Sequence, residues 1–287
     1  MKYTLRLPQQ EAIEKTLAFW RQEKNPARRK FLWNAKPRFG KTLAAYDFAK
    51  QIAAKRILII TNRPAIADSW AHDFFRYIAP TSELIFTSAR SQCGTERVYS
   101  RTELLKDQTL LMRPLIHFIS LQDIKGKDST SNEFKAKNRW IFEVEQPWDL
   151  LIIDEGHDGA GTVKSRAIFD RVKSDFILVL SGTPFRILAN QEFSDEQIYN
   201  WTYLDEQNTA TTLPPLEFRL SESFSDHDAQ LEFLARELSD PHSLWLLTDV
   251  ESCRVMRAQL QKHPVFSSYR IILAAGRDAS IHGLKTL

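Results

Sequence analysis

The sequence predicts an α/β fold built on a mainly parallel sheet. Short, almost continuously apolar segments recur along the first two thirds of the chain, and segments with a helical spacing of apolar residues separate them. Near-continuous apolar strands are typical of a sheet that is covered on both faces. Regular alternation of strand and helix favours parallel pairing, because parallel neighbours need a long crossover connection. The 287 residues are 43% hydrophobic and 26% charged, as in ordinary globular proteins.

Six segments are predicted to be buried strands, namely 31–35, 56–61, 83–87, 115–120, 149–154 and 176–181. The segments 41–55 and 65–78 are predicted to be helices. In the first of them, Leu43, Tyr46 and Ile52 recur at roughly helical intervals. Strands and helices therefore alternate from residue 31 to residue 181.

A change in composition predicts a domain boundary near residue 212. The stretch 208–220 is rich in Thr and Pro and is predicted to be a linker. Helices are predicted over 227–238 and 251–262, and strands over 244–248 and 270–275. We therefore expect a first domain over residues 1–212, and over residues 213–287 a linker followed by the incomplete start of a second α/β unit.

Charge and cysteine content leave several classes of partner open. There are 39 Lys and Arg residues against 36 Asp and Glu residues, a net charge of +3, which excludes neither nucleic acid nor a small ligand. Cys93 and Cys253 lie far apart and are predicted to be free thiols in a reducing compartment. The amino terminus lacks the apolar core of a signal peptide, and no apolar run approaches the ~18 residues that span a bilayer. We expect a cytoplasmic protein with no membrane contact.

The segment WNAKPRFGKT (33–42) predicts a phosphate-binding loop between the strand 31–35 and the helix that follows. Such a loop directs backbone N–H groups and a helix N-terminus at an anion. Lys41 would reach the terminal phosphates of a nucleotide, and the Thr42 hydroxyl would bind Mg²⁺. Gly40 stands where the backbone comes closest to phosphate. A Gly-Lys-Thr turn at the surface of a helix is the alternative.

Two further motifs follow predicted strands. In LLIIDEGHDGA (150–160), Asp154 at the strand tip would hold Mg²⁺, and Glu155 would act as general base toward the attacking water. In LVLSGTPFR (178–186), a strand brings Ser181 and Thr183 to a tight Gly-Pro turn. An acidic turn and an ordinary Gly-Pro turn are the alternatives when each motif is taken alone.

Together the three motifs resemble those of the superfamily 2 helicases and translocases, two-lobed motors that use ATP on nucleic acid. Members commonly write the loop A-x-x-G-x-G-K-T, and this chain matches it except at Arg38, where Gly is usual. DEGH resembles the DExH form of the second motif, and SGTP resembles the third. The resemblance implies a RecA-like P-loop NTPase lobe, followed by an incomplete second RecA-like lobe, with ATP and Mg²⁺ as ligands.

The resemblance also implies roles for individual residues. LRLPQQEAI (5–13) is similar to an element in which Gln9 reads adenine, although Gln9 by itself is an ordinary residue at a helix start. TNRPAIADSW (61–70) and FISLQDI (118–124) are similar to nucleic-acid motifs. The implied sites are nucleotide contacts at Gln9, Arg38, Phe39, Gly40, Lys41 and Thr42; catalysis by Lys41, Glu155 and His157; metal binding by Thr42 and Asp154; nucleic-acid contacts at Arg63, Ser120 and Gln122; and coupling between lobes at Ser181 and Thr183.

Five segments together look most like motor subunits of bacterial restriction or phage-defence systems, namely WNAKPRFGKT, TNRPAIADSW, DEGH, SGTPFR and EQIYNWTYLDEQ (196–207). The resemblance implies ATP hydrolysis coupled to movement along nucleic acid, DNA rather than RNA, with nuclease or methyltransferase domains or subunits as partners. An ATP-gated binding module without translocation and an RNA helicase are the alternatives. No Q-x-x-G-R-x-x-R element is present before Leu287, so this chain alone is expected to hydrolyse ATP poorly.

Overall fold

The chain divides into two compact units in the computed structural model, Met1–Pro215 and Leu216–Leu287. The boundary predicted after residue 212 lies outside the described residues. The structure describes residues 3–89, 97–125, 127–128, 131–134, 138–143, 146–154, 168–209, 227–238 and 243–273.

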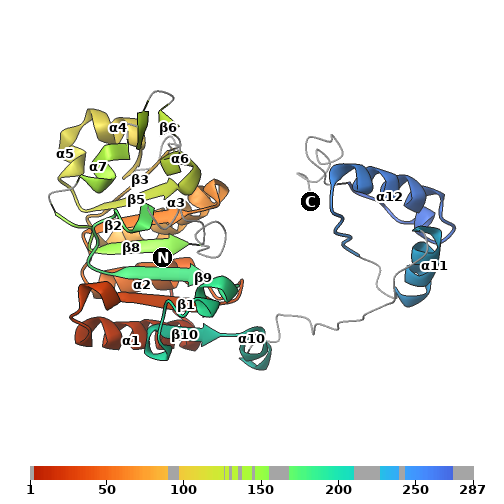
Figure 1. Ribbon diagram of the computed structural model, residues 1–287, viewed down its shortest axis with the longest axis horizontal. Coiled ribbons are helices and arrows are strands. Elements are labelled where there is room, and N and C mark those ends of the chain that lie inside the picture. Colours follow the sequence, from red (N-terminus) through yellow and green to blue (C-terminus); the bar gives the residue numbers. More distant parts are fainter. Residues whose placement is uncertain are drawn as a thin grey trace. The chain divides into compact units, whose positions relative to one another are not determined.

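One sheet organises the first unit, and its strands run in the order β10-β1-β9-β8-β2-β5-β3-β4. Every pairing in this sheet is parallel, so the predicted α/β fold is confirmed (Figure 1). The strands are β1 (Lys30–Ala35), β2 (Arg56–Thr61), β3 (Ile85–Ser88), β4 (Val98–Ser100), β5 (Leu115–Ser120), β8 (Leu150–Asp154), β9 (Ile177–Ser181) and β10 (Ile198–Trp201). A separate antiparallel pair joins β6 (Lys127–Asp128) to β7 (Ser131–Phe134).

Helices cover both faces of this sheet, which explains why its strands are apolar almost throughout. In β1, Phe31, Trp33 and Ala35 face one core and Leu32 faces the other. Full burial of a Phe or Leu side chain, such as Phe31 or Leu32, stabilises the fold by about 1.5–3 kcal/mol. The first core is closed by α1 (Leu7–Gln22), α2 (Lys41–Gln51) and α3 (Ala67–Asp73), and the second by α4 (Arg101–Lys106), α5 (Gln108–Leu111), α6 (Leu121–Lys125) and α7 (Arg139–Phe142).

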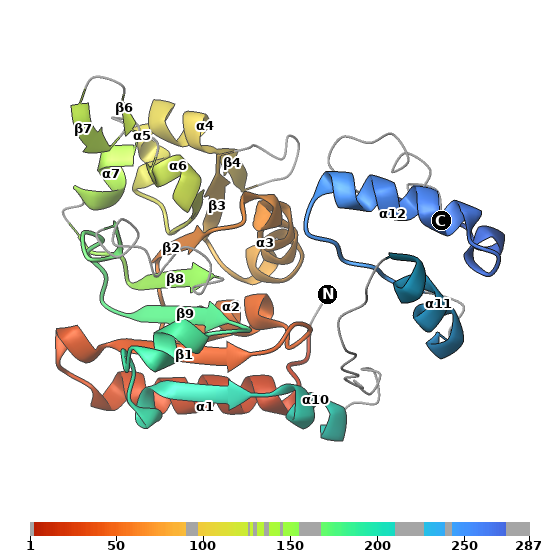
Figure 2. The same cartoon turned by 45° about the vertical axis from the view of Figure 1, so that its right-hand side comes forward.

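Parallel pairing gathers the carboxyl ends of the strands at one edge of the sheet (Figure 2). In register, Asn34 of β1 lies opposite Ser181 of β9, and Leu180 of β9 lies opposite Asp154 of β8. Thr61 of β2 lies opposite both Asp154 and Ser120 of β5. The loops that follow these five strands therefore begin side by side, and they carry most of the predicted site. Two short helices, α9 (Phe185–Ala189) and α10 (Tyr203–Thr209), follow β9 and β10.

The second unit contains the two predicted helices, α11 (His227–Glu237) and α12 (Val250–Lys262), around a small core of Leu231, Met256 and Phe266. The strand predicted over 244–248 was wrong, because this segment is irregular and Leu244 and Leu246 are 84% and 86% exposed. A strand needs a neighbour to pair its backbone, and the described part of this unit contains none. The predicted strand 270–275 is irregular through residue 273, and its last two residues lie outside the described ranges.

The cysteines and the length of the helices also bear on the predictions. Cys253 is a free thiol, as predicted, whereas Cys93 lies outside the described residues. Among the helices that the structure describes, none is both long enough and apolar enough to cross a membrane.

Candidate nucleotide and nucleic-acid site

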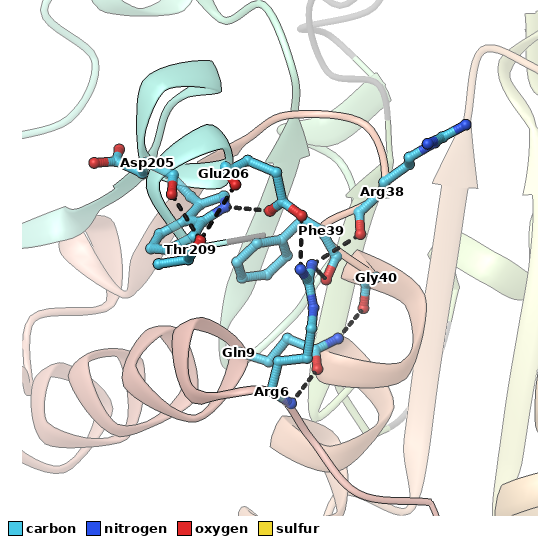
Figure 3. Close-up of polar contacts among 9 residues, drawn as sticks. Arg6, Gln9, Arg38, Phe39, Gly40, Asp205, Glu206 and Thr209 are labelled. Carbon is cyan, nitrogen blue, oxygen red and sulfur yellow. Dashed lines mark hydrogen bonds and ion pairs between the residues drawn. The ribbon is translucent and has the colours of Figure 1, made fainter. Parts of the chain in front are cut away.

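The loop between β1 and α2 contains two residues in the left-handed region of backbone space. Arg38 has a φ of 71° and Gly40 a φ of 84°. A Cβ makes this backbone conformation unfavourable, which explains why glycine is usual at both positions in the superfamily 2 motors. Gly40 is also crowded, because a Cβ there would lie 2.4 Å from Nε2 of Gln9. Arg38 adopts this left-handed conformation although it carries a Cβ, and its side chain points away from the loop (Figure 3).

Positive charge surrounds this loop. The side chain of Arg38 is exposed, and Lys36 and Lys41 lie at either end of the turn. Nζ of Lys41 donates to the carbonyl oxygen of Ala35 at 2.6 Å, and Nζ of Lys36 donates to that of Gly182 at 2.6 Å. Helix α2 begins at Lys41 with Gly40 as its N-cap, so its positive end faces the same place. These charges and this helix terminus fit the phosphates of a nucleotide.

Gln9 and Phe39 hold the loop from inside. The buried amide of Gln9 donates to the carbonyl oxygen of Gly40 at 3.1 Å and accepts from the N–H of Arg6 at 2.7 Å. A glutamine amide has two donors and two acceptor positions, and these two bonds use one of each. Recognition of adenine by Gln9 stays a prediction. The side chain of Phe39 is buried, with ring centroids 6.2–6.4 Å from those of Trp33, Tyr199 and Trp201. The enclosed ring of Phe39 therefore anchors the loop, and a nucleotide contact at Phe39 stays a prediction.

Asp154 of the second motif and the described third motif lie near the loop because β1, β9 and β8 are neighbours. Oδ2 of Asp154 accepts from Nε1 of the buried Trp70 at 3.0 Å, which fixes the orientation of the carboxylate. Ser181 is buried, and its Oγ accepts from the N–H of Thr183 at 3.2 Å. The carboxylate of Asp154 and the hydroxyl of Thr42 are oxygen ligands of the type that Mg²⁺ prefers. Glu155 and His157 lie outside the described residues.

The predicted nucleic-acid residues follow β2 and β5, the next strands along the same edge. Arg63 is exposed, and Nε2 of Gln122 donates to the carbonyl oxygen of Asn62 at 2.8 Å. Oγ of Ser120 accepts from the N–H of Asp123 at 3.1 Å. A cavity of about 450 Å³ lies here, and its lining includes Ser120, Gln122, Asp123 and Arg101.

Four residues of this region were missed by the sequence analysis. Trp70 orients Asp154, and Arg101 lines the cavity beside Ser120. Arg6 and Glu206 form an ion pair of 2.7 Å next to the loop. Arg6 and Trp70 lie inside segments that resemble motifs, but nothing in their spacing indicates these contacts. Arg101 lies outside the motifs, whereas Glu206 lies inside the segment EQIYNWTYLDEQ (196–207), but the contacts of both residues become recognisable only in the folded sheet.

The first unit has the architecture of a P-loop nucleotide-binding lobe. In its parallel sheet, a strand is followed by a left-handed loop and by a helix that begins at Lys-Thr. The chain belongs to the family described as type III restriction enzyme, res subunit, whose model matches residues 2–186. This membership confirms the predicted resemblance to superfamily 2 motor subunits of restriction systems.

The chain is also similar to a curated protein and, in fold, to solved structures. The chain is 28% identical over 244 residues to a putative type II restriction enzyme and methyltransferase of Mycoplasma pneumoniae, covering 71% of this chain and 32% of that protein. It thus spans about a third of the length of this curated relative.

A nuclease-deletion mutant of the Type ISP restriction-modification enzyme LlaGI, solved with a DNA substrate mimic, has the same fold. It is 14% identical with a TM-score of 0.52, covering 91% of this chain and 23% of LlaGI. The Sulfolobus solfataricus SWI2/SNF2 ATPase core in complex with dsDNA is 18% identical, with a TM-score of 0.47, and covers 68% of this chain and 35% of that one.

Proposed function

We propose that this chain is the ATP-binding motor lobe of a restriction enzyme, in which ATP hydrolysis drives movement along nucleic acid, DNA rather than RNA. One observation carries the proposal. The phosphate loop, the Ser181 turn and Asp154 follow three adjacent strands, and the predicted nucleic-acid residues follow the next two. A nucleotide and a nucleic-acid strand would therefore bind along the same edge of one rigid sheet.

At the nucleotide, the chain would contribute binding and a proton acceptor. Lys41, the backbone of the loop from Arg38 to Gly40 and the first turn of α2 would hold the phosphates, and Thr42 and Asp154 would hold Mg²⁺. Bound Mg²⁺ would offset the negative charge of the phosphate oxygens. We assign to Glu155 the role of general base, which takes the proton of the attacking water, with His157 beside it in the same motif. Ser181 and Thr183 would pass the state of this site to a second lobe.

At the nucleic acid, Arg63, Ser120 and Gln122 would contact phosphates. We add Arg101 because it lines the same cavity as Ser120 and Gln122. Contacts of this kind hold a strand without reading its sequence. The Mycoplasma pneumoniae relative is named both as a restriction enzyme and as a methyltransferase. This name supports nuclease and methyltransferase domains or subunits as partners of the motor. Such an assembly would work in the cytoplasm, where ATP and DNA meet.

The phosphate-loop assignment is tested by Lys41→Ala. Loss of the ammonium group should weaken Mg-ATP binding on the order of a hundredfold, because hydrogen bonds to charged groups are strong ones. The measurement is a fluorescent-nucleotide titration. Lys50→Ala removes the same charge from the exposed end of α2 and should bind as the unaltered chain does. Equal affinity for Lys41→Ala and Lys50→Ala would contradict the assignment.

The motor assignment is tested by ATP turnover in the full-length protein. Turnover should rise when DNA is added, and Glu155→Gln should lower it on the order of 10²–10⁴-fold while ATP binding persists. Stimulation by RNA alone would instead identify an RNA helicase. Turnover that ignores both nucleic acids would favour an ATP-gated binding module.

A further inference from the structure

Arg6 lies immediately before α1 and connects the phosphate loop to α10. Its Nη2 donates to the carbonyl oxygens of Arg38 and Phe39, at 2.8 and 2.9 Å. Its Nη1 donates to Oε1 of Glu206 at 2.7 Å. Figure 3 shows the guanidinium group between the loop on one side and Glu206 on the other. Arg6 thus contacts both the loop and a residue that is 200 positions away from it in the sequence.

The two bonds to the loop fix the orientation of successive peptide groups. In a trans peptide, the carbonyl and the following N–H point in opposite directions. Because the carbonyls of Arg38 and Phe39 point toward Arg6, the N–H groups of Phe39 and Gly40 point away from it. The N–H of Phe39 closes the turn on Lys36 at 3.2 Å. The N–H of Gly40 is therefore presented on the opposite side, as anion binding by such a loop requires.

The same bonds also hold an unfavourable backbone conformation in place. Arg38 carries a Cβ and yet has a φ of 71°. Residues other than glycine keep such a conformation only where their surroundings impose it. A charged donor shared between two adjacent carbonyl oxygens is a restraint of this kind, since charge-assisted hydrogen bonds are stronger than neutral ones.

Glu206 in turn depends on Arg6. The glutamate is 2% exposed, and its Oε2 accepts from Nε1 of Trp201 at 2.6 Å. Burial raises the pKa of Glu206, but the hydrogen bonds from Arg6 and Trp201 and the charge of Arg6 outweigh it, so the pKa lies below its ordinary value. A buried carboxylate that stays ionised needs such partners. The pair is therefore built into the fold rather than being a contact between two mobile surface side chains.

We propose that Arg6 and Glu206 are a positioning pair, which holds the phosphate loop in its nucleotide-binding shape and transmits a change at the loop to α10. The inference rests on the proposed function, because it takes the loop to bind ATP. Helix α10 ends at Thr209, and the second unit begins at Leu216. In the sequence, α10 is thus the last described helix before the second unit.

The first test is nucleotide affinity in Arg6→Ala, Glu206→Gln and the double variant. Each single change should weaken ATP binding by about tenfold or more. The double variant should lose less than the two single losses together, since residues in one network are not additive. Arg6→Lys keeps the charge but lacks the planar fork, and it should also bind more weakly. Arg21→Ala and Glu14→Gln, both exposed on α1, are matched controls that should bind normally.

The second readout separates positioning from simple stabilisation. Saturating ATP should slow hydrogen–deuterium exchange of the amides in 203–209 in the unaltered chain, and this slowing should be lost in Arg6→Lys and Glu206→Gln. If ATP binds the unaltered chain and all variants equally, the positioning pair is overturned while the proposed function stands. If exchange in α10 ignores bound ATP, the transmission to α10 is overturned. If the unaltered chain binds no ATP, the proposed function fails and the inference fails with it.

Discussion

Gly40 combines a left-handed backbone with crowded surroundings, so it is the loop position at which a side chain should be least tolerated. In Gly40→Ala, the φ of 84° would cost about 1–2 kcal/mol. The new methyl group would also displace the amide of Gln9, whose Nε2 would lie 2.4 Å away. We expect the free energy of unfolding to fall by about 1–3 kcal/mol, with weaker ATP binding. Chemical denaturation and a nucleotide titration measure the two effects.

Arg38→Gly is the matched comparison, because it alters the other left-handed residue of the loop. Glycine removes the strain but makes the unfolded chain more flexible, so stability should change by less than about 1 kcal/mol. If Gly40→Ala proved as stable as Arg38→Gly, the backbone conformation assigned to this loop would be contradicted.

At the scale of helices and strands, burial decided what the sequence could predict. Each of the six predicted strands is covered on both faces of the sheet, so nearly all of its side chains are apolar. This continuous apolar run made the strands recognisable in the sequence. Strands β4 and β10 were not predicted. They are the two edges of the sheet, of three and four residues, and Asn200 of β10 is exposed. An edge strand pairs on one side only, and its shorter, more polar sequence gives a weaker signal.

The parts of the site that the sequence predicted lie in short local segments, whereas the other parts depend on strand pairing. Local motifs located the loop, the Asp154 strand end and the Ser181 turn. The contact between Arg6 and Glu206 exists only because β10 pairs with β1 and so brings α10 to the loop. Arg6 and Glu206 are 200 positions apart, so no spacing of residues within a short segment indicates their contact. Conversely, the apolar segment 244–248 predicted a strand that the structure lacks, because hydrophobicity alone supplies no pairing partner.

The carboxyl end of β5 allows a test at this scale, since it places Ser120 and Gln122 beside Arg101 of α4. Arg101→Ala should weaken nucleic-acid binding about equally for all sequences. It should also lower the salt dependence of log affinity by about one unit of slope, because one phosphate contact is lost. Binding curves at several salt concentrations measure the slope. Arg113→Ala, just before the amino end of β5, is the control that should leave it unchanged. An altered base preference with an unchanged slope would argue against a phosphate contact.

At the scale of the whole molecule, the two units differ in how they bury apolar surface. The first has a core on each face of its sheet, whereas the core described in the second centres on Leu231, Met256 and Phe266. A unit with its own cores can fold alone. The residues proposed to bind nucleotide, from Gln9 to Thr42 and at Asp154, all belong to the first unit. So do Arg6 and Glu206.

We therefore propose that residues 1–212 form an autonomous domain, and we expect this segment by itself to unfold cooperatively and to bind ATP with the affinity of the complete chain. Thermal unfolding and a nucleotide titration test both statements. A shorter segment, residues 1–201, keeps β10 but lacks α10 and with it Glu206, so Arg6 loses its charged partner. It should bind ATP more weakly than residues 1–212, although the phosphate loop is intact. If residues 1–212 lost ATP binding, the nucleotide site would have to include groups from the second unit, and the domain boundary proposed here would be wrong.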